Sequence, residues 1–190
     1  MIEENFSLSD VEIKLLKNLI GKKILCIESL IFPGDDDFWW PVRIDTDSSK
    51  VIVCNDLTVA KYFETEEDCG RLSIKEGGGV EFQEEENKKI YNKKINRIVE
   101  DVIVVEDKII FPEDKEYSSY KFIYPIAIII KFNDDSLVIE RGWIFQEYMN
   151  IQLQDNNMIN VREELSDWYD PDEDNTVPEI IRNTISLSNL

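Results

Sequence analysis

The chain has 190 residues, of which 43% are hydrophobic and 32% are charged. A chain of this length and composition buries roughly 70% of its unfolded surface, which excludes a disordered chain and favours a single domain over residues 1–190. Its 40 acidic and 21 basic residues give a formal net charge of -19, which disfavours direct binding to nucleic acid and to anionic membrane surfaces.

The cysteines and the N-terminal residues indicate the cellular compartment. Cys26, Cys54 and Cys69 occur without a CxxC spacing, and an odd number of scattered cysteines is typical of free thiols in a reducing environment. The first ten residues are acidic and do not have the order of an export signal. No apolar run approaches the roughly 18 residues of a membrane-spanning helix. We therefore expect a soluble cytoplasmic protein.

Residues 9–21 show the clearest helical pattern. Ser9 and Glu12 have the spacing of a capping box, in which each side chain accepts a hydrogen bond from a backbone N–H at the helix start. Gly21 is a typical residue to end the helix. The apolar face comprises Val11, Leu15, Leu16 and Leu19. We expect this face to pack on a sheet of the same domain.

Two later segments resemble each other, and we interpret residues 24–55 and 102–141 as an internal repeat. Both contain Ile-Phe-Pro, at residues 31–33 and 110–112, and Phe-x-aromatic-Pro, at residues 38–41 and 122–125. In both, an acidic loop separates these signatures, and a turn rich in Asp and Ser precedes a last strand. The order predicts two related β-meanders of three strands each.

The aromatic-proline signatures indicate how the side chains are oriented. Pro41 and Pro125 cannot donate a hydrogen bond to a neighbouring strand, so we expect each at a strand start, a bulge or an edge. Side chains alternate between the two faces of a strand, which places Phe38 and Trp40 on one face and Trp39 on the other. If Phe38 and Trp40 face the core, Trp39 is exposed.

Residues 56–100 form an irregular connector in this interpretation. Residues 58–68 are predicted as a short helix, and the glycines at 77–79 as a mobile loop. Two Glu-to-Lys pairs spaced four residues apart favour a helix over residues 84–99, with a strand over its last residues as the alternative.

After the second unit, residues 147–153 have the alternation of a strand, and residues 160–170 have the spacing of a helix. Residues 171–190 contribute a second short helix or form a loose tail. The predicted fold class is therefore α+β. It has a mostly antiparallel sheet built from the two meander units, an N-terminal helix and one or two C-terminal helices.

The residue types limit the chemistry. The chain contains no histidine, which removes the commonest general base and the usual zinc ligand. No spacing selects a catalytic pair among the carboxylates, so no catalytic residue is assigned. Asp170, Asp172 and Asp174 occupy the first, third and fifth positions of an EF-hand-like loop and are weak calcium candidates. Asn175 stands where such a loop requires glycine, and Ile181 stands where it requires the bidentate glutamate. We therefore expect no bound metal, and we expect no cofactor.

The candidate partner-binding residues are Asp35, Asp36, Asp37 and Trp39, which combine negative charge with an aromatic anchor. We expect a non-enzymatic binding protein whose acidic surface engages a basic protein partner. Small acidic bacterial immunity proteins and nucleic-acid mimics, which inhibit basic proteins, share this charge character. The analogy rests on charge alone, without a family motif.

Two other classes of function stay open. One is a carboxylate-based or metal-dependent enzyme with a pocket between the two meander units. The other is a subunit of a homo-oligomer, joined through Trp39 or through residues 126–130 if these form an edge strand.

Overall fold

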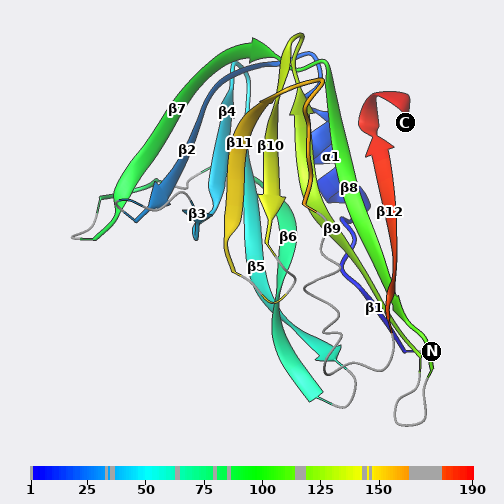
Figure 1. The fold of residues 1–190 in the computed structure, drawn as a ribbon. Coiled ribbons are helices and arrows are strands. Elements are labelled where there is room, and N and C mark those ends of the chain that lie inside the picture. The colour runs from blue at the N-terminus through cyan, green and yellow to red at the C-terminus, as the bar shows by residue number, and fades with distance from the viewer. Residues whose placement is uncertain are drawn as a thin grey trace.

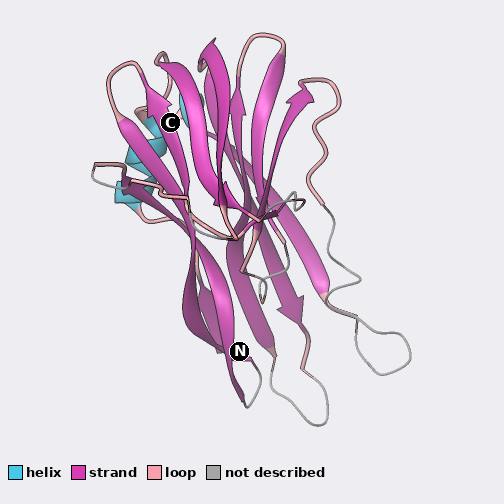
Figure 2. Cartoon of the chain, turned by 90° about the vertical axis from the view of Figure 1, so that its left-hand side faces the viewer, coloured by secondary structure: helices cyan, strands magenta, loops and turns pink. Residues whose placement is uncertain are grey.

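The computed structural model describes residues 2–32, 34, 37–62, 65–78, 81–84, 87–113, 119–142, 145, 147–162 and 177–190. Within these residues the chain forms two β-sheets that pack face to face, with one short helix beside them (Figures 1 and 2). The fold is mostly antiparallel β-sheet, as the sequence predicts.

The first sheet has five strands in the order β6-β5-β4-β2-β7, and every neighbouring pair is antiparallel. Its strands are β2 (Lys23–Ile31), β4 (Val42–Thr46), β5 (Lys50–Tyr62), β6 (Thr65–Glu76) and β7 (Lys89–Ile98). The order leaves β6 and β7 at the two edges. Beyond β4, β5 and β6 continue as a long two-stranded ribbon (Figure 1).

The second sheet has seven strands, six of them in the order β12-β8-β9-β10-β11-β3. Its strands are β1 (Ile2–Asn5), β3 (Asp37–Phe38), β8 (Asp101–Phe111), β9 (Tyr120–Lys131), β10 (Asp135–Arg141), β11 (Met149–Asp155) and β12 (Glu179–Ser186). The seventh strand, β1, runs parallel to the first residues of β9, while β10 pairs with its last residues. Two strands therefore share one side of β9.

The helix predicted at residues 9–21 is confirmed as α1 (Asp10–Lys17), and its capping box is present. The backbone N–H of Ser9 donates to the Glu12 carboxylate over 2.8 Å, and the N–H of Glu12 donates to Ser9 Oγ over 3.4 Å. Gly21 follows the helix with a φ of 80°, a conformation that glycine adopts without steric strain.

The apolar face of α1 packs against β6 and against the 3₁₀ turn η1 (Leu187–Asn189). Leu16 and Leu19 are fully buried in the core. Val11, by contrast, is 69% exposed, so the predicted apolar face is wrong at this residue, which lies on the first turn and faces solvent. No described helix has the length and apolar character needed to cross a bilayer.

Both predicted meanders have the expected strand order. β2, β4 and β5 pair in sequence in the five-stranded sheet, and β8, β9 and β10 pair in sequence in the seven-stranded sheet. The units differ at β3, which leaves its own meander and pairs with β11 of the other sheet. An origin by duplication is not confirmed and stays a prediction.

Two hydrophobic clusters hold the sheets together. The first fills the space between the sheets; it includes Leu16, Leu19, Ile24, Ile27, Ile44, Val53, Leu72, Val104, Ile128, Ile130 and Ile139. The second surrounds the first half of β9; it includes Phe6, Ala60, Cys69, Ile109, Tyr120, Phe122, Tyr124 and Ile126. Both clusters contain side chains of β9, so this strand contributes to the whole interior.

A β-bulge interrupts the ladder between β8 and β9, where the register shifts between Val105 and Glu106. On β8 the buried positions change there from even-numbered to odd-numbered residues. Pro125 lies at this bulge, opposite Glu106, and Pro41 immediately precedes β4. Both prolines therefore occupy positions that the sequence predicts, where a missing N–H does not interrupt a regular ladder.

The prediction of an irregular, partly helical connector over residues 56–100 is wrong. The predicted helix at 58–68 lies in the β5–β6 hairpin, whose strands pair continuously from Val51 and Glu76 to Tyr62 and Thr65. The predicted helix at 84–99 is largely β7, which pairs with β2. Short local preferences for helix are overridden because both segments gain backbone partners and bury apolar side chains on a sheet.

The predicted C-terminal helices are also corrected where the structure describes the chain. Residues 179–186 form strand β12, which pairs with β8 over eight residues, and η1 is a single 3₁₀ turn. Residues 177–190 are thus not a loose tail, because Leu187 is fully buried in the first cluster. Most of the helix predicted at 160–170 lies outside the described residues.

Residues 126–130 do not form an edge strand, so joining copies through them is excluded. They lie in β9, between β8 on one side and β10 on the other over Ala127–Ile130. Their run of apolar residues reflects burial on both faces of a central strand.

An ion pair fixes β12 to β8. The guanidinium of Arg182 donates from Nε and Nη2 to the two carboxylate oxygens of Asp107, each over 2.7 Å. Asp107 is fully buried. Arg182 also donates to the backbone carbonyls of Val161 and Arg162, so the same side chain holds the segment after β11 against the sheet.

We expect the Arg182→Ala variant to be destabilised by about 3–5 kcal/mol, because it leaves the Asp107 carboxylate buried without its cation. The free energy of unfolding in denaturant measures this loss. Lys108→Ala, on the next residue of β8, is the matched control and should change stability little. The double variant Asp107→Asn with Arg182→Ala should be less destabilised than Arg182→Ala alone, and equal losses in both would contradict the coupling.

Candidate functional site

Four aromatic side chains gather where β2 ends and where β3 meets β11. They come from Phe32, which follows β2, from Trp39 and Trp40, which follow β3, and from Tyr148, which precedes β11. We call these four residues the aromatic surface. Trp39 is 42% exposed and Phe32 is 39% exposed. Two large aromatic residues thus remain accessible to solvent in one region of the fold.

The rings of the aromatic surface form two pairs. Phe32 and Trp40 pack edge to face with ring centroids 5.0 Å apart, and Trp39 lies against Tyr148 with centroids 5.4 Å apart. Aromatic pairs at such distances contribute about 0.5–1.5 kcal/mol beyond the burial of their area. Each exposed ring is therefore held by a neighbouring ring before any partner arrives.

Phe38 anchors this surface from the interior. Its ring is buried and packs edge to face on Tyr91 of β7, with centroids 4.9 Å apart. Because β3 pairs with β11 of the seven-stranded sheet, this contact connects β3 to an edge of the five-stranded sheet. The predicted alternation is confirmed for Phe38, which is buried, and for Trp39, which is exposed, whereas Trp40 is only partly buried and packs on Phe32.

A basic side chain lies against one ring of the aromatic surface. The ammonium group of Lys88 lies 4.7 Å from the centroid of the Trp40 ring, a cation–π distance. Asp37 belongs to β3 and pairs through its backbone with Asn150. The predicted site residues Asp35 and Asp36 lie outside the described residues, as do the weak calcium candidates Asp170, Asp172 and Asp174.

Sequence reasoning identified Trp39 but missed its neighbours. Phe32 lies within the repeated Ile-Phe-Pro signature, which we interpreted only as a strand end. Tyr148 is distant in sequence and reaches Trp39 only because β3 pairs with β11. A single-residue alternation rule can indicate which side chain points outward, but it cannot indicate which distant ring lies beside it.

The space between the two meander units is filled by apolar side chains of the first cluster, such as Ile27, Ile44, Ile128 and Ile139. A cavity of about 530 Å³ lies instead at the turns that join β7 to β8 and β9 to β10, beside Asn96, Phe132 and Asp134. Among the described residues, no cluster of three side chains could hold a metal ion.

The three cysteines are free thiols. Burial raises the pKa of all three, with nearby Asp and Glu side chains adding to the effect. The pKa of Cys69 rises to about 11. These thiols are therefore protonated at neutral pH and are poor nucleophiles.

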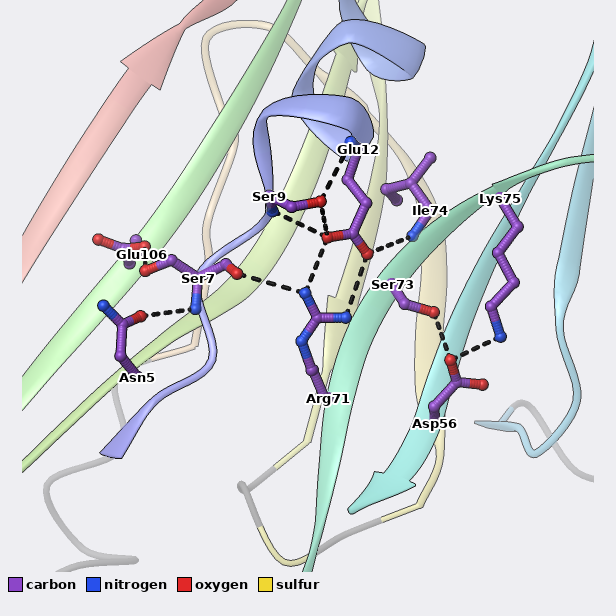
Figure 3. Close-up of polar contacts among 10 residues, drawn as sticks. All are labelled: Asn5, Ser7, Ser9, Glu12, Asp56, Arg71, Ser73, Ile74, Lys75 and Glu106. Carbon is purple, nitrogen blue, oxygen red and sulfur yellow. Dashed lines mark hydrogen bonds and ion pairs between the residues drawn. The ribbon is translucent and has the colours of Figure 1, made fainter. Parts of the chain in front are cut away.

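The densest polar network connects α1 to β6 and centres on Glu12 (Figure 3). One carboxylate oxygen accepts hydrogen bonds from the backbone N–H and hydroxyl of Ser9 and from Arg71 Nη2, at 2.7–2.8 Å. The other accepts from Arg71 Nη1 and from the backbone N–H of Ile74, both over 3.1 Å. Every contact is to a group that positions the helix or the strand, so this cluster is an anchor.

The network shifts the titration of Glu12. Burial by itself raises the pKa of this carboxyl, but the hydrogen bonds from Arg71, Ser9 and Ile74 outweigh burial and lower the pKa from 4.5 to about 2. A carboxyl with a lowered pKa stabilises the folded state in its ionised form.

Three partly buried carboxylates also act as anchors. Arg43 is held by Glu28 over 2.9 Å and by Asp45 over 2.8 Å. Asp101 accepts from the hydroxyl of Ser186 and from the backbone N–H of Ser188, which fixes the C-terminal turn. These carboxylates are engaged in holding the sandwich together.

Glu12→Gln should destabilise the protein by about 3 kcal/mol at neutral pH, since a shift of 2.5 pKa units corresponds to this free energy. The stabilisation from ionised Glu12 is fully present above pH 4.5 and is lost as the pH falls towards 2. The difference in unfolding free energy between wild type and variant should therefore shrink over this range. Glu76→Gln, at an exposed position of β6, is the control; a difference that does not change with pH would contradict this assignment.

Comparison with known proteins gives no match to this chain among family models, curated proteins or solved structures.

Proposed function

We propose that this chain is a non-enzymatic binding protein that engages a basic protein partner through the aromatic surface and the adjoining acidic residues 35–37. The observation that carries the proposal is the pair of exposed rings, Trp39 and Phe32, which are separated in the sequence by a run of three aspartates. Trp and Tyr are the residues most often responsible for the binding energy of protein interfaces.

The packing of the aromatic surface supports a role in binding. Contact with Tyr148 restricts the ring of Trp39, and contact with Trp40 restricts the ring of Phe32, before a partner binds. Ordering a mobile side chain at an interface costs about 0.5–1.5 kcal/mol, and a ring that is already held avoids much of this cost. Binding at such a surface requires no movement of the underlying sheets.

The charge of the chain determines the kind of partner that fits. With a net charge of -19, the protein attracts basic proteins over distances comparable to the Debye length and repels nucleic acids. Inhibition of a basic nuclease or of a DNA-binding protein, in the manner of an immunity protein or a nucleic-acid mimic, is the form of binding that we propose. Its rate of association should fall as salt rises.

Affinity capture from the native host lysate at low salt, with stepwise elution by salt, tests this function. We expect a basic protein to elute from wild-type resin. Its affinity, once it is purified, should be about 30-fold weaker for Trp39→Ala, because a central aromatic anchor contributes about 2 kcal/mol or more.

Met158→Ala is the matched control, because Met158 is an exposed apolar residue outside the aromatic surface. It should bind as wild type does. A partner that is acidic, that binds equally well at high salt, or that binds Trp39→Ala with unchanged affinity would contradict the proposal.

A further inference from the structure

The two edges of the five-stranded sheet carry opposite charges. At one edge, β7 pairs with β2 alone among the described strands. Its sequence KIYNKKINRI contains Lys89, Lys93 and Lys94, and both Lys89 and Lys94 are exposed. A basic strand of this kind is unusual in a chain with a net charge of -19.

At the other edge, β6 is acidic where it is accessible. Glu66, Glu67 and Asp68 are exposed near the start of β6, which pairs with β5 alone among the described strands. Near the end of the strand, the backbone N–H of Ile74 already donates to Glu12 of α1. The helix therefore covers one half of this edge and leaves the acidic half for another strand.

Apolar side chains accompany both edges. Leu57 and Val59 of β5 are 57% and 56% exposed, and Val59 lies directly opposite Asp68 in the ribbon. At the basic edge, Ile98 is exposed at the end of β7. An edge strand with exposed apolar neighbours can gain both backbone hydrogen bonds and apolar contact when a new strand is added.

The direction of the strands determines how the edges could meet. Four successive antiparallel pairings separate β6 from β7, so the two edge strands run in the same direction. A second copy that continues the sheet would therefore place its β6 parallel to β7 of the first. The contact is head to tail, so a pair of copies keeps one unused acidic edge on one copy and one unused basic edge on the other.

We propose that copies of this chain associate through these edges, with the basic stretch Lys89–Lys94 of one copy against the acidic stretch Glu66–Asp68 of the next. Opposite charges across neighbouring strands stabilise a pairing, while like charges oppose it. Pairing of β7 with β7, or of β6 with β6, is therefore disfavoured. The lysines of β7 also oppose pairing with other basic strands, which makes the contact selective.

Sedimentation velocity over a range of protein concentrations tests this association at about 0.15 M salt, where the general repulsion between copies of net charge -19 is screened beyond about 8 Å. Wild type should show a mass that rises with concentration above that of the monomer. The double variants Lys93→Glu with Lys94→Glu, and Glu66→Lys with Glu67→Lys, should each stay monomeric, because in each of them the two edges carry the same charge. Mixing the two variants in equal amounts should restore association, because opposite charges then meet again.

Two controls separate this contact from a general effect of charge and from contact through the aromatic surface. Lys14→Glu with Lys17→Glu makes the same change in charge on exposed positions of α1 and should associate as wild type does. Trp39→Ala should also associate normally, because the Trp39 ring packs against Tyr148, which precedes β11 of the other sheet. Circular dichroism establishes that each variant is folded. A wild-type protein that stays monomeric at every concentration, or a mixture of folded variants that does not reassociate, would overturn the proposal.

Discussion

The pairing of β8 with β9 is the constraint on which the rest of the sandwich depends. β9 has β8 along one side and both β1 and β10 along the other, so it organises most of the seven-stranded sheet. Its side chains enter both hydrophobic clusters. In the second half of β9, Ile128 and Ile130 enter the first cluster while Ala127 and Ile129 enter the second, because successive side chains point to opposite faces of a strand.

Two sheets of this size expose edges, and the structure protects them by different means. α1 lies beside the end of β6, and the Glu12 carboxylate accepts the hydrogen bond that the Ile74 N–H would otherwise offer to another strand. β7 instead carries lysines, a common protection of an exposed edge. Charge on an edge excludes most strands but favours one of opposite sign, so the same residues that prevent aggregation can select a partner.

Both proposed contacts depend on surfaces that distant segments build together. The aromatic surface requires the end of β2, the short strand β3 and the start of β11 to lie side by side. The buried carboxylates, by contrast, hold arginines and backbone groups in place. This division, with exposed rings on the surface and carboxylates that hold the structure, is the basis of the binding role that we propose.

Features that depend on neighbouring residues could be predicted from the sequence. The capping box of α1, the turn at Gly21, the two meanders and the exposed side of Trp39 all follow from local hydrogen bonding, backbone sterics and the alternation of side chains along a strand. The strands at residues 58–62, 65–68, 89–98 and 179–186 could not be predicted in this way. Their local preferences are weak, and the backbone partners that stabilise them, on β5, β2 and β8, come from pairing with other strands. The contact of Trp39 with Tyr148 and the opposite charges of the edge strands β6 and β7 could not be predicted from the sequence either. Both depend on strand order, which is set by long-range burial and not by the residues next to each strand.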